Sequence, residues 1–278
     1  MRPPQMLNEK RQTIWLSIFL AASLSLLLAS GCQNQGQPAG DKHAQVALYS
    51  DRGVWPQSVT AAERMFQWMG YEVEQINAQD VRNRILANYR LLCVPGGNMY
   101  SYAEDLSSAG VENIKGFVRH GGVYIGICGG AYFAAENVIW QGNRLPMRSL
   151  EFFPGTAQGP FDEIAPYPDS AMCLVNMVDS EHAITKSMPD SAWILYYWGP
   201  ALMPDADADL DTLGKYDIID QPAILALEYG TGRVFLIGTH PEIEEDSDRD
   251  GVTECDELDD RGSDWDLMKA ATLWSLRE

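Results

Sequence analysis

Residues 121–134 read GGVYIGICGGAYFA, a stretch that joins an apolar run to a helix-like segment through several glycines. The continuous apolar run Val123–Ile127 is typical of a buried strand in a parallel sheet. Cys128 follows this run within the pattern G-x-C-x-G, a cysteine version of the sharp strand-to-helix turn that exposes a nucleophile. The glycines permit the turn, and the start of the next helix favours a thiolate. Taken alone, the pattern fits a buried structural cysteine equally well.

Strand-like and helix-like segments alternate on both sides of this turn. Apolar runs predict strands at 45–50, 71–76, 90–94 and 123–127, and helical spacing predicts helices at 58–69, 80–88 and 111–120. This alternation predicts an α/β fold, with a parallel sheet covered by helices on both faces. Later segments predict strands at 172–178, 192–198, 223–228 and 233–238 and a closing helix at 265–276. Because no linker follows residue 43, we expect residues 44–278 to form one domain.

A histidine and a carboxylate follow another predicted strand. Thr239-His240-Pro241-Glu242 comes directly after the apolar run VFLIG. His240 could accept the thiol proton of Cys128, and Glu242 could hold the tautomer of the ring and stabilise its charged form.

A third strand end supplies backbone amides. Pro95-Gly96-Gly97 follows the apolar run LLCV, and the amides of Gly97 and Gly129 could together bind an oxyanion. A tight turn is the simpler interpretation of the three residues taken alone.

The three motifs, in the order PGG, GxCxG and HPE, resemble the class I glutamine amidotransferase superfamily. Within it, the chain is most similar to the N-terminal domain of biotin-protein ligases and its stand-alone relatives. VALYSDRGV, VPGGNMYSY, EFFPGTAQGP, YYWGP and YGTGRVFLIGTHPE add to this resemblance, which covers roughly residues 45–245. It implies a flavodoxin-like α/β fold with Cys128 as nucleophile, His240 as base and Glu242 as the residue that orients it. It implies neither biotin ligation, because the catalytic half of the ligase lies outside this kind of domain, nor the use of glutamine.

Aromatic residues are frequent near these motifs. Core packing is the expected role of most of them, and lining of a pocket is the alternative. The residues concerned are Tyr100, Tyr102, Tyr132, Phe133, Tyr196, Tyr197 and Trp198.

Composition and charge exclude several classes of protein. The chain has 278 residues, of which 46% are hydrophobic and 21% charged, a mixture typical of globular proteins and not of disordered ones. Its 20 basic and 39 acidic residues give a net charge of −19. Such a charge repels phosphate backbones, so we expect no nucleic-acid partner.

The first part of the chain is typical of a bacterial lipoprotein. Residues 1–31 contain a basic start and an uncharged apolar run, and they end just before Cys32 in the sequence LASGC. We therefore expect residues 1–31 to be a signal peptide, Cys32 to carry a lipid anchor, and the polar residues 32–43 to be a tether. A plain cleaved signal or an uncleaved anchor is the alternative. Export to an oxidising compartment would permit one disulfide among Cys93, Cys128, Cys173 and Cys255, and the sequence does not say which.

An acidic loop at 246–257 reads DSDRDGVTECDE, the spacing of an EF-hand calcium loop. The expected ligands are the side chains of Asp246, Asp248, Asp250, Glu254 and Glu257 and the carbonyl of Val252. Thr253 replaces the usual apolar residue, and Pro241 leaves little space for an incoming helix. We therefore expect an isolated EF-hand-like loop that binds Ca²⁺ in a structural role, with a merely solvated acidic loop as the alternative.

Together these observations predict an exported, lipid-anchored cysteine hydrolase or amidase that acts through a thioester. The expected substrate is a small molecule or peptide-like compound, no organic cofactor is expected, and the membrane contact is the lipid anchor. The alternative is a binding or structural protein that keeps the fold and performs no turnover.

Overall fold

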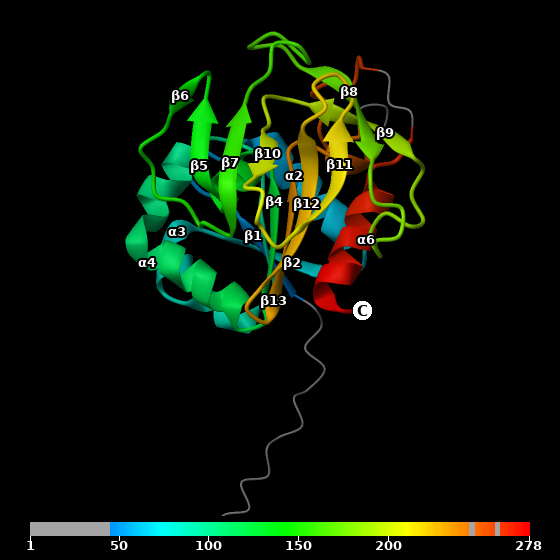
Figure 1. The fold of residues 1–278 in the computed structure, drawn as a ribbon. Helices are drawn as coiled ribbons and strands as arrows, with labels where there is room; N and C mark the ends of the chain where they lie inside the picture. The colour runs from blue at the N-terminus through cyan, green and yellow to red at the C-terminus, as the bar shows by residue number, and fades with distance from the viewer. Residues whose placement is uncertain (1–44, 245–247, 259–261) are drawn as a thin grey trace, which may run out of the picture. The chain divides into compact units, whose positions relative to one another are not determined.

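The computed structural model describes residues 45–244, 248–258 and 262–278. Its main element is a nine-stranded sheet in the order β2-β1-β3-β4-β13-β12-β11-β8-β9 (Figure 1). The first part of this sheet is parallel and contains the predicted strands of the first half of the chain. These are β2 (Glu72–Ile76), β1 (Gln45–Tyr49), β3 (Leu91–Val94) and β4 (Val123–Ile127), joined by β13 (Gly232–Ile237).

The sheet continues with antiparallel strands beyond β13. They are β12 (Pro222–Tyr229), β11 (Asp211–Tyr216), β8 (Ala171–Met177) and β9 (Ser191–Tyr196). The strands expected at 172–178, 192–198, 223–228 and 233–238 are thus confirmed. The α/β class and the parallel sheet near the motifs are confirmed as well, but the whole sheet is mixed because short hairpin connections can join only antiparallel neighbours.

A second, four-stranded sheet was not expected from the sequence. It has the order β10-β7-β5-β6. Its strands are β10 (Ala201–Pro204), β7 (Phe153–Gly159), β5 (Ala135–Trp140) and the two-residue β6 (Asn143–Arg144). Glycines and a proline inside β7 weaken the strand pattern of its sequence.

Helices cover both faces of the large sheet, as predicted. Successive residues of β1 alternate between two cores: Ala47 and Tyr49 contribute to one, and Val46 and Leu48 to the other. The first core includes residues of α3 (Ala78–Arg82), α4 (Met99–Arg119), α5 (Gly129–Ala134) and the small sheet. The second includes residues of α2 (Pro56–Trp68) and α6 (Trp265–Leu276).

Two of the predicted helices differ from the observed ones at their ends. The helix expected at 80–88 is split into α3 and the 3₁₀ turn Ile85–Asn88, because Arg84 adopts a φ of 65°. The helix expected at 111–120 begins earlier, since Asn98 accepts a hydrogen bond from the amide of Tyr100 and caps α4. α4 contains a kink at Ser107, whose φ is 57°.

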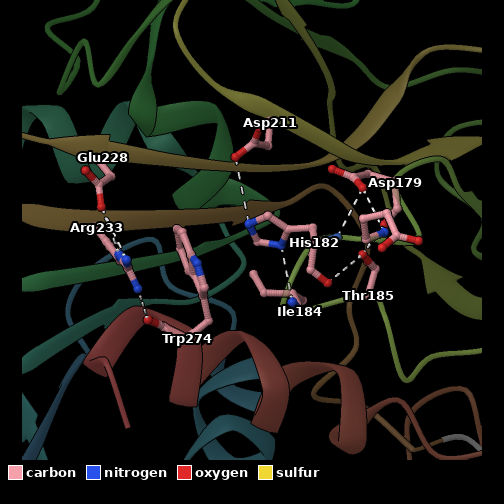
Figure 2. Close-up of polar contacts among 9 residues, drawn as sticks. Asp179, His182, Ile184, Thr185, Asp211, Glu228, Arg233 and Trp274 are labelled. Atoms are coloured by element: carbon pink, nitrogen blue, oxygen red, sulfur yellow. Dashed lines mark hydrogen bonds and ion pairs between the residues drawn. The ribbon is translucent and has the colours of Figure 1, made fainter.

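The C-terminal helix is attached to the sheet through Trp274. Figure 2 shows its ring between Arg233 of β13 and His182 of the loop that joins β8 and β9. The guanidinium of Arg233 lies 4.5 Å from the ring centroid of Trp274, and Arg233 also donates hydrogen bonds to Glu228. This contact positions α6 so that Trp265, at its other end, reaches the segment that carries His240.

Within the described residues, no helix combines the length and the apolar character needed to cross a membrane.

Candidate active site

Cys128 lies in a sharp turn between β4 and α5. Its φ of 47° is in the left-handed region, which is uncommon for a residue other than glycine. The turn is held by a hydrogen bond from the amide of Cys128 to the carbonyl of Ile237, 2.9 Å away on β13. The Sγ atom lies 3.6 Å from the carbonyl oxygen of Tyr197, and the side chain is 6% exposed at the edge of a cavity. This is the turn that the sequence predicts.

His240 and Glu242 follow β13, the strand next to β4. The amide of His240 donates to the carbonyl of Leu195, and Nδ1 of the ring lies 2.8 Å from Oε1 of Glu242. Trp55 packs edge-on against the ring at 5.0 Å between centroids. With Nδ1 bonded to the carboxylate, Nε2 is the ring nitrogen left without a hydrogen-bond partner among the described residues.

The charges around His240 favour its protonated form. Burial of the imidazole opposes that form and is the largest single effect. The thiolate of Cys128 and the carboxylate of Glu242 act in the opposite direction, and together they raise the pKa of His240 well above its usual value. The ring of His240 is therefore favoured in the charged form, which can donate a proton.

Ser58 of α2 is a site residue that the sequence analysis missed. It is fully buried, and its hydroxyl donates to Oε1 of Glu242 while accepting a hydrogen bond of 2.9 Å from the amide of Gly96. It thus joins the carboxylate to the Pro95–Gly97 turn. Ser58 lies in a helix with ordinary spacing, so nothing in the local sequence distinguishes it from other serines.

Gly97 and Gly129, the predicted oxyanion residues, come together at the edge of this site. A Cβ added to Gly129 would lie 2.3 Å from the carbonyl oxygen and 2.7 Å from the amide nitrogen of Gly97. Only glycine permits this approach. At Gly96, a Cβ would lie 2.4 Å from Cε1 of His240, so this glycine also makes space for the ring. The roles of these residues in catalysis stay predictions.

The site opens into a cavity of about 560 Å³. Cys128, His240 and Gly97 line it together with a large aromatic surface. Tyr100, Tyr132, Tyr197 and Trp198 belong to this lining, whereas Tyr102, Phe133 and Tyr196 do not line it and are buried in the cores; Tyr132 belongs to the first core as well. Core packing, the expected role of most of these aromatic residues, is thus found for four of the seven, and the alternative of lining a pocket is found for Tyr100, Tyr197 and Trp198 and, in addition to its core role, for Tyr132.

Further lining residues were not predicted. Trp55 follows β1, Trp140 and Leu145 flank the small hairpin of β5 and β6, and Tyr167 follows β7. Trp55 could have been found from the rule that ligands bind at the carboxyl ends of parallel strands. Trp140 belongs to the small sheet, and Leu145 and Tyr167 lie in the segments that follow its strands β6 and β7; the sequence does not reveal this sheet.

The family model for the N-terminal domain of biotin-protein ligases matches residues 44–266. The chain belongs to the biotin-protein ligase N-terminal domain family. An uncharacterised protein from Chlamydia muridarum is 34% identical over 212 residues, which are 71% of this chain and 80% of that protein. The biotin–protein ligase of Schizosaccharomyces pombe is 30% identical over 167 residues. That match covers 56% of this chain but only 26% of the ligase.

Solved structures agree with this family assignment at the level of the fold. A glutamine amidotransferase from Thermotoga maritima superposes with a TM-score of 0.53 at 12% identity, covering 85% of this chain and 99% of that protein. A ThuA-like protein from Bacteroides uniformis gives 0.53 at 13% identity, covering 87% and 94%. The family member described here thus has a fold of the flavodoxin-like, glutamine amidotransferase type.

The acidic loop of this family member is only partly described, because Asp246 lies outside the described residues. Asp250 is buried, and its two carboxylate oxygens accept hydrogen bonds from the amides of Glu244 (3.0 Å) and Val252 (3.1 Å). Glu254 accepts a hydrogen bond from Gln57. Among the described residues, no three His, Cys, Asp or Glu side chains are placed together to hold a metal ion. Calcium binding, with the ligands listed above from the sequence, stays a prediction.

Among the described residues, no disulfide joins any two of the cysteines. Cys93 and Cys173 are buried in the second core, and Cys255 is half-buried. Cys32 lies outside the described residues.

Replacement of Ser58 tests its link to Glu242. We expect Ser58→Ala to lower the free energy of unfolding by about 1–3 kcal/mol, because a buried carboxylate loses a hydrogen-bond donor. We also expect slower alkylation of Cys128 at neutral pH, since His240 is then less firmly oriented. Thr60→Ala, on the exposed side of the same helix, is the matched control and should change neither quantity. Equal alkylation rates in all three proteins would contradict the assignment.

Calcium binding can be separated from the structural role of Asp250. If the loop binds calcium with a dissociation constant of about 10⁻⁴–10⁻³ M, a few millimolar calcium should stabilise the protein by about 1–2 kcal/mol. Calorimetry in calcium and in chelator measures this difference. Asp248→Ala should abolish it, whereas Asp250→Asn should destabilise the protein in both conditions. Identical melting temperatures of the wild type in the two conditions would contradict calcium binding.

Proposed function

We propose that this family member is a cysteine hydrolase or amidase in which Cys128 is the nucleophile. The observation that carries the proposal is the buried His240, which lies between the Glu242 carboxylate and the thiol and has a raised pKa. A glutamine amidotransferase among the solved structures with the same fold is compatible with acyl transfer to a cysteine.

The proposed reaction begins with attack of the Cys128 thiolate on the carbonyl carbon of an amide or ester. The oxygen becomes an oxyanion, which the amides of Gly97 and Gly129 would bind. As the C–N or C–O bond breaks, the imidazolium of His240 gives its proton to the leaving amine or alcohol. A thioester with Cys128 remains.

Water completes the proposed cycle. Neutral His240 takes a proton from the water molecule while the oxygen of that water attacks the thioester carbon. The C–S bond then breaks, the carboxylic acid leaves, and the thiolate–imidazolium pair is restored. Glu242 stabilises the charged ring in both steps through Nδ1 and does not itself touch the substrate.

We further propose that the protein is exported and held at a membrane by a lipid on Cys32. The LASGC sequence after an apolar run supports this proposal.

The reactivity of Cys128 tests the catalytic assignment. A fully ionised thiol reacts at pH 7 up to roughly 30-fold faster than a free cysteine that ionises near pH 8.5. We therefore expect rapid iodoacetamide alkylation of Cys128 at pH 7, slowed about tenfold or more by His240→Ala and less by Glu242→Gln. Buried Cys93 and Cys173 serve as internal controls and should stay unlabelled. If Cys128 reacts like a free thiol in the wild type and in both variants, the catalytic assignment is wrong and the protein is a non-catalytic binding protein.

The lipid anchor has an independent test. Intact-mass measurement of protein extracted from membranes should show a chain that begins at a lipid-modified Cys32. In Cys32→Ser, the lipid-modified mass should be absent. A mature chain that begins elsewhere, or an unmodified Cys32, would contradict the anchor.

A further inference from the structure

We propose that the cavity beside Cys128 selects an uncharged acyl compound with a flat, aromatic or similarly apolar acyl group. This inference rests on the proposed function, because it names the class of substrate that the same site accepts. It excludes free amino acids and other carboxylate-bearing compounds, glutamine included.

Among the described residues, the lining carries no carboxylate, ammonium or guanidinium group that could pair with a charged substrate. None of its described residues is Asp, Glu, Lys or Arg. Apart from Cys128 and His240, its polar side-chain groups are those of Asn98, four tyrosines and three tryptophans. Burial raises the pKa of Tyr132 and of Tyr197, so both hydroxyls stay neutral at physiological pH. A carboxylate that entered this cavity would lose its hydration, and the one cationic group of the described lining, the His240 ring, is already paired with the Glu242 carboxylate.

The aromatic residues form a connected wall around the cavity. Trp55 contacts Tyr197 at 4.9 Å between ring centroids, and Tyr197 contacts Trp198 at 4.3 Å. The series continues from Trp198 to Tyr167 at 4.7 Å, and from Tyr167 to Trp140 at 6.3 Å. Tyr132 closes it beneath Trp140, at 5.7 Å. Such a surface offers ring faces and edges to a flat ligand and provides only apolar contact and hydroxyl hydrogen bonds.

The wall is held firmly by the backbone around Trp198. This residue has a φ of 63°, and its indole nitrogen donates to the carbonyl of Asp169 at 3.1 Å. Its own carbonyl accepts a hydrogen bond of 3.1 Å from the hydroxyl of Tyr132. A bulky residue in the left-handed region persists only where its surroundings determine it, and residues of this kind gather at ligand sites.

Size and overall charge point to the same class of substrate. A cavity of about 560 Å³ suits a compound of one or two rings. The net charge of −19 further disfavours anions. An aromatic wall can also attract a quaternary ammonium group, and a cationic substrate is the alternative that the experiment has to separate.

A matched series of alkylating reagents measures the preference directly. The reagents are N-benzyl-2-chloroacetamide, its 4-carboxy and 4-trimethylammonio analogues, and 2-chloroacetamide as the common reference. Rates of labelling of Cys128 in the full chain are followed by intact mass and divided by the rate of 2-chloroacetamide, after correction for each reagent's reactivity with glutathione. We expect a ratio of at least about 10 for the neutral benzyl reagent and of about 1 or less for the carboxy analogue.

Substitutions of lining residues test which side chains cause the preference for the neutral benzyl reagent. Trp140→Ala and, on a more exposed part of the lining, Tyr100→Ala should each lower the benzyl ratio by about three- to tenfold. Trp68→Ala removes a partly exposed indole that does not line the cavity and should leave the ratio unchanged. Leu145→Lys places a cation in the lining and should raise the ratio of the carboxy analogue above its wild-type value.

The outcomes distinguish this inference from the proposed function. Because each ratio refers to the same thiol, it reports on the cavity even if Cys128 is not activated. A benzyl ratio near 1 together with fast, His240-dependent alkylation would overturn the substrate class and leave the hydrolase in place. A preference for the carboxy or the ammonium analogue would overturn the substrate class in the same way. A high benzyl ratio without His240 dependence would support the class of ligand for a protein that binds without turnover.

Discussion

The buried carboxylate of Glu242 is the charge around which the site is arranged. Its side chain is fully removed from solvent, which is costly unless the charge is paired and hydrogen-bonded. The partners are His240, in the segment that follows β13, and Ser58 of α2. Ser58 also binds the amide of Gly96, and Trp265 of α6 donates to the backbone carbonyl of Glu242. The histidine is therefore held in one tautomer and one orientation by elements far apart in the sequence.

The parallel part of the sheet explains why these elements meet. Strands β1, β3, β4 and β13 are neighbours, and their carboxyl ends lie on the same edge of the sheet. Three of these strands are followed by a site segment: the Pro95–Gly97 turn, Cys128 and His240. The backbone amides, the thiol and the imidazole therefore meet at this edge of the sheet although they are far apart in the sequence. Short turns after neighbouring strands are therefore enough to bring together the thiol, the proposed base and the two glycine amides.

The antiparallel strands and the small sheet complete the cavity. β9 ends at Tyr196 and is followed by Tyr197 and Trp198, which form one wall beside the thiol. The hairpin of β5 and β6 brings Trp140 and Leu145 to another part of the lining. The proposed reactive groups thus come from the parallel part of the sheet, while Trp140, Tyr197 and Trp198 of the cavity lining come from the small sheet and from the antiparallel strand β9 and the residues after it.

The sequence by itself determined the parallel strands, the turn at Cys128 and the motif that carries His240 and Glu242. These features depend on local signals: a run of apolar residues, glycines at a sharp turn, and residues placed at a strand end. Only the tertiary structure decided the role of Ser58, the mixed character of the sheet, and which aromatic residues line the cavity instead of the cores. Tyr102 and Tyr100 are two residues apart in one helix, yet one is buried and the other is 40% exposed at the cavity. The two residues lie on different faces of the helix, but the sequence predicted a helix only at 111–120, and which face the distant strands cover is decided by the tertiary structure.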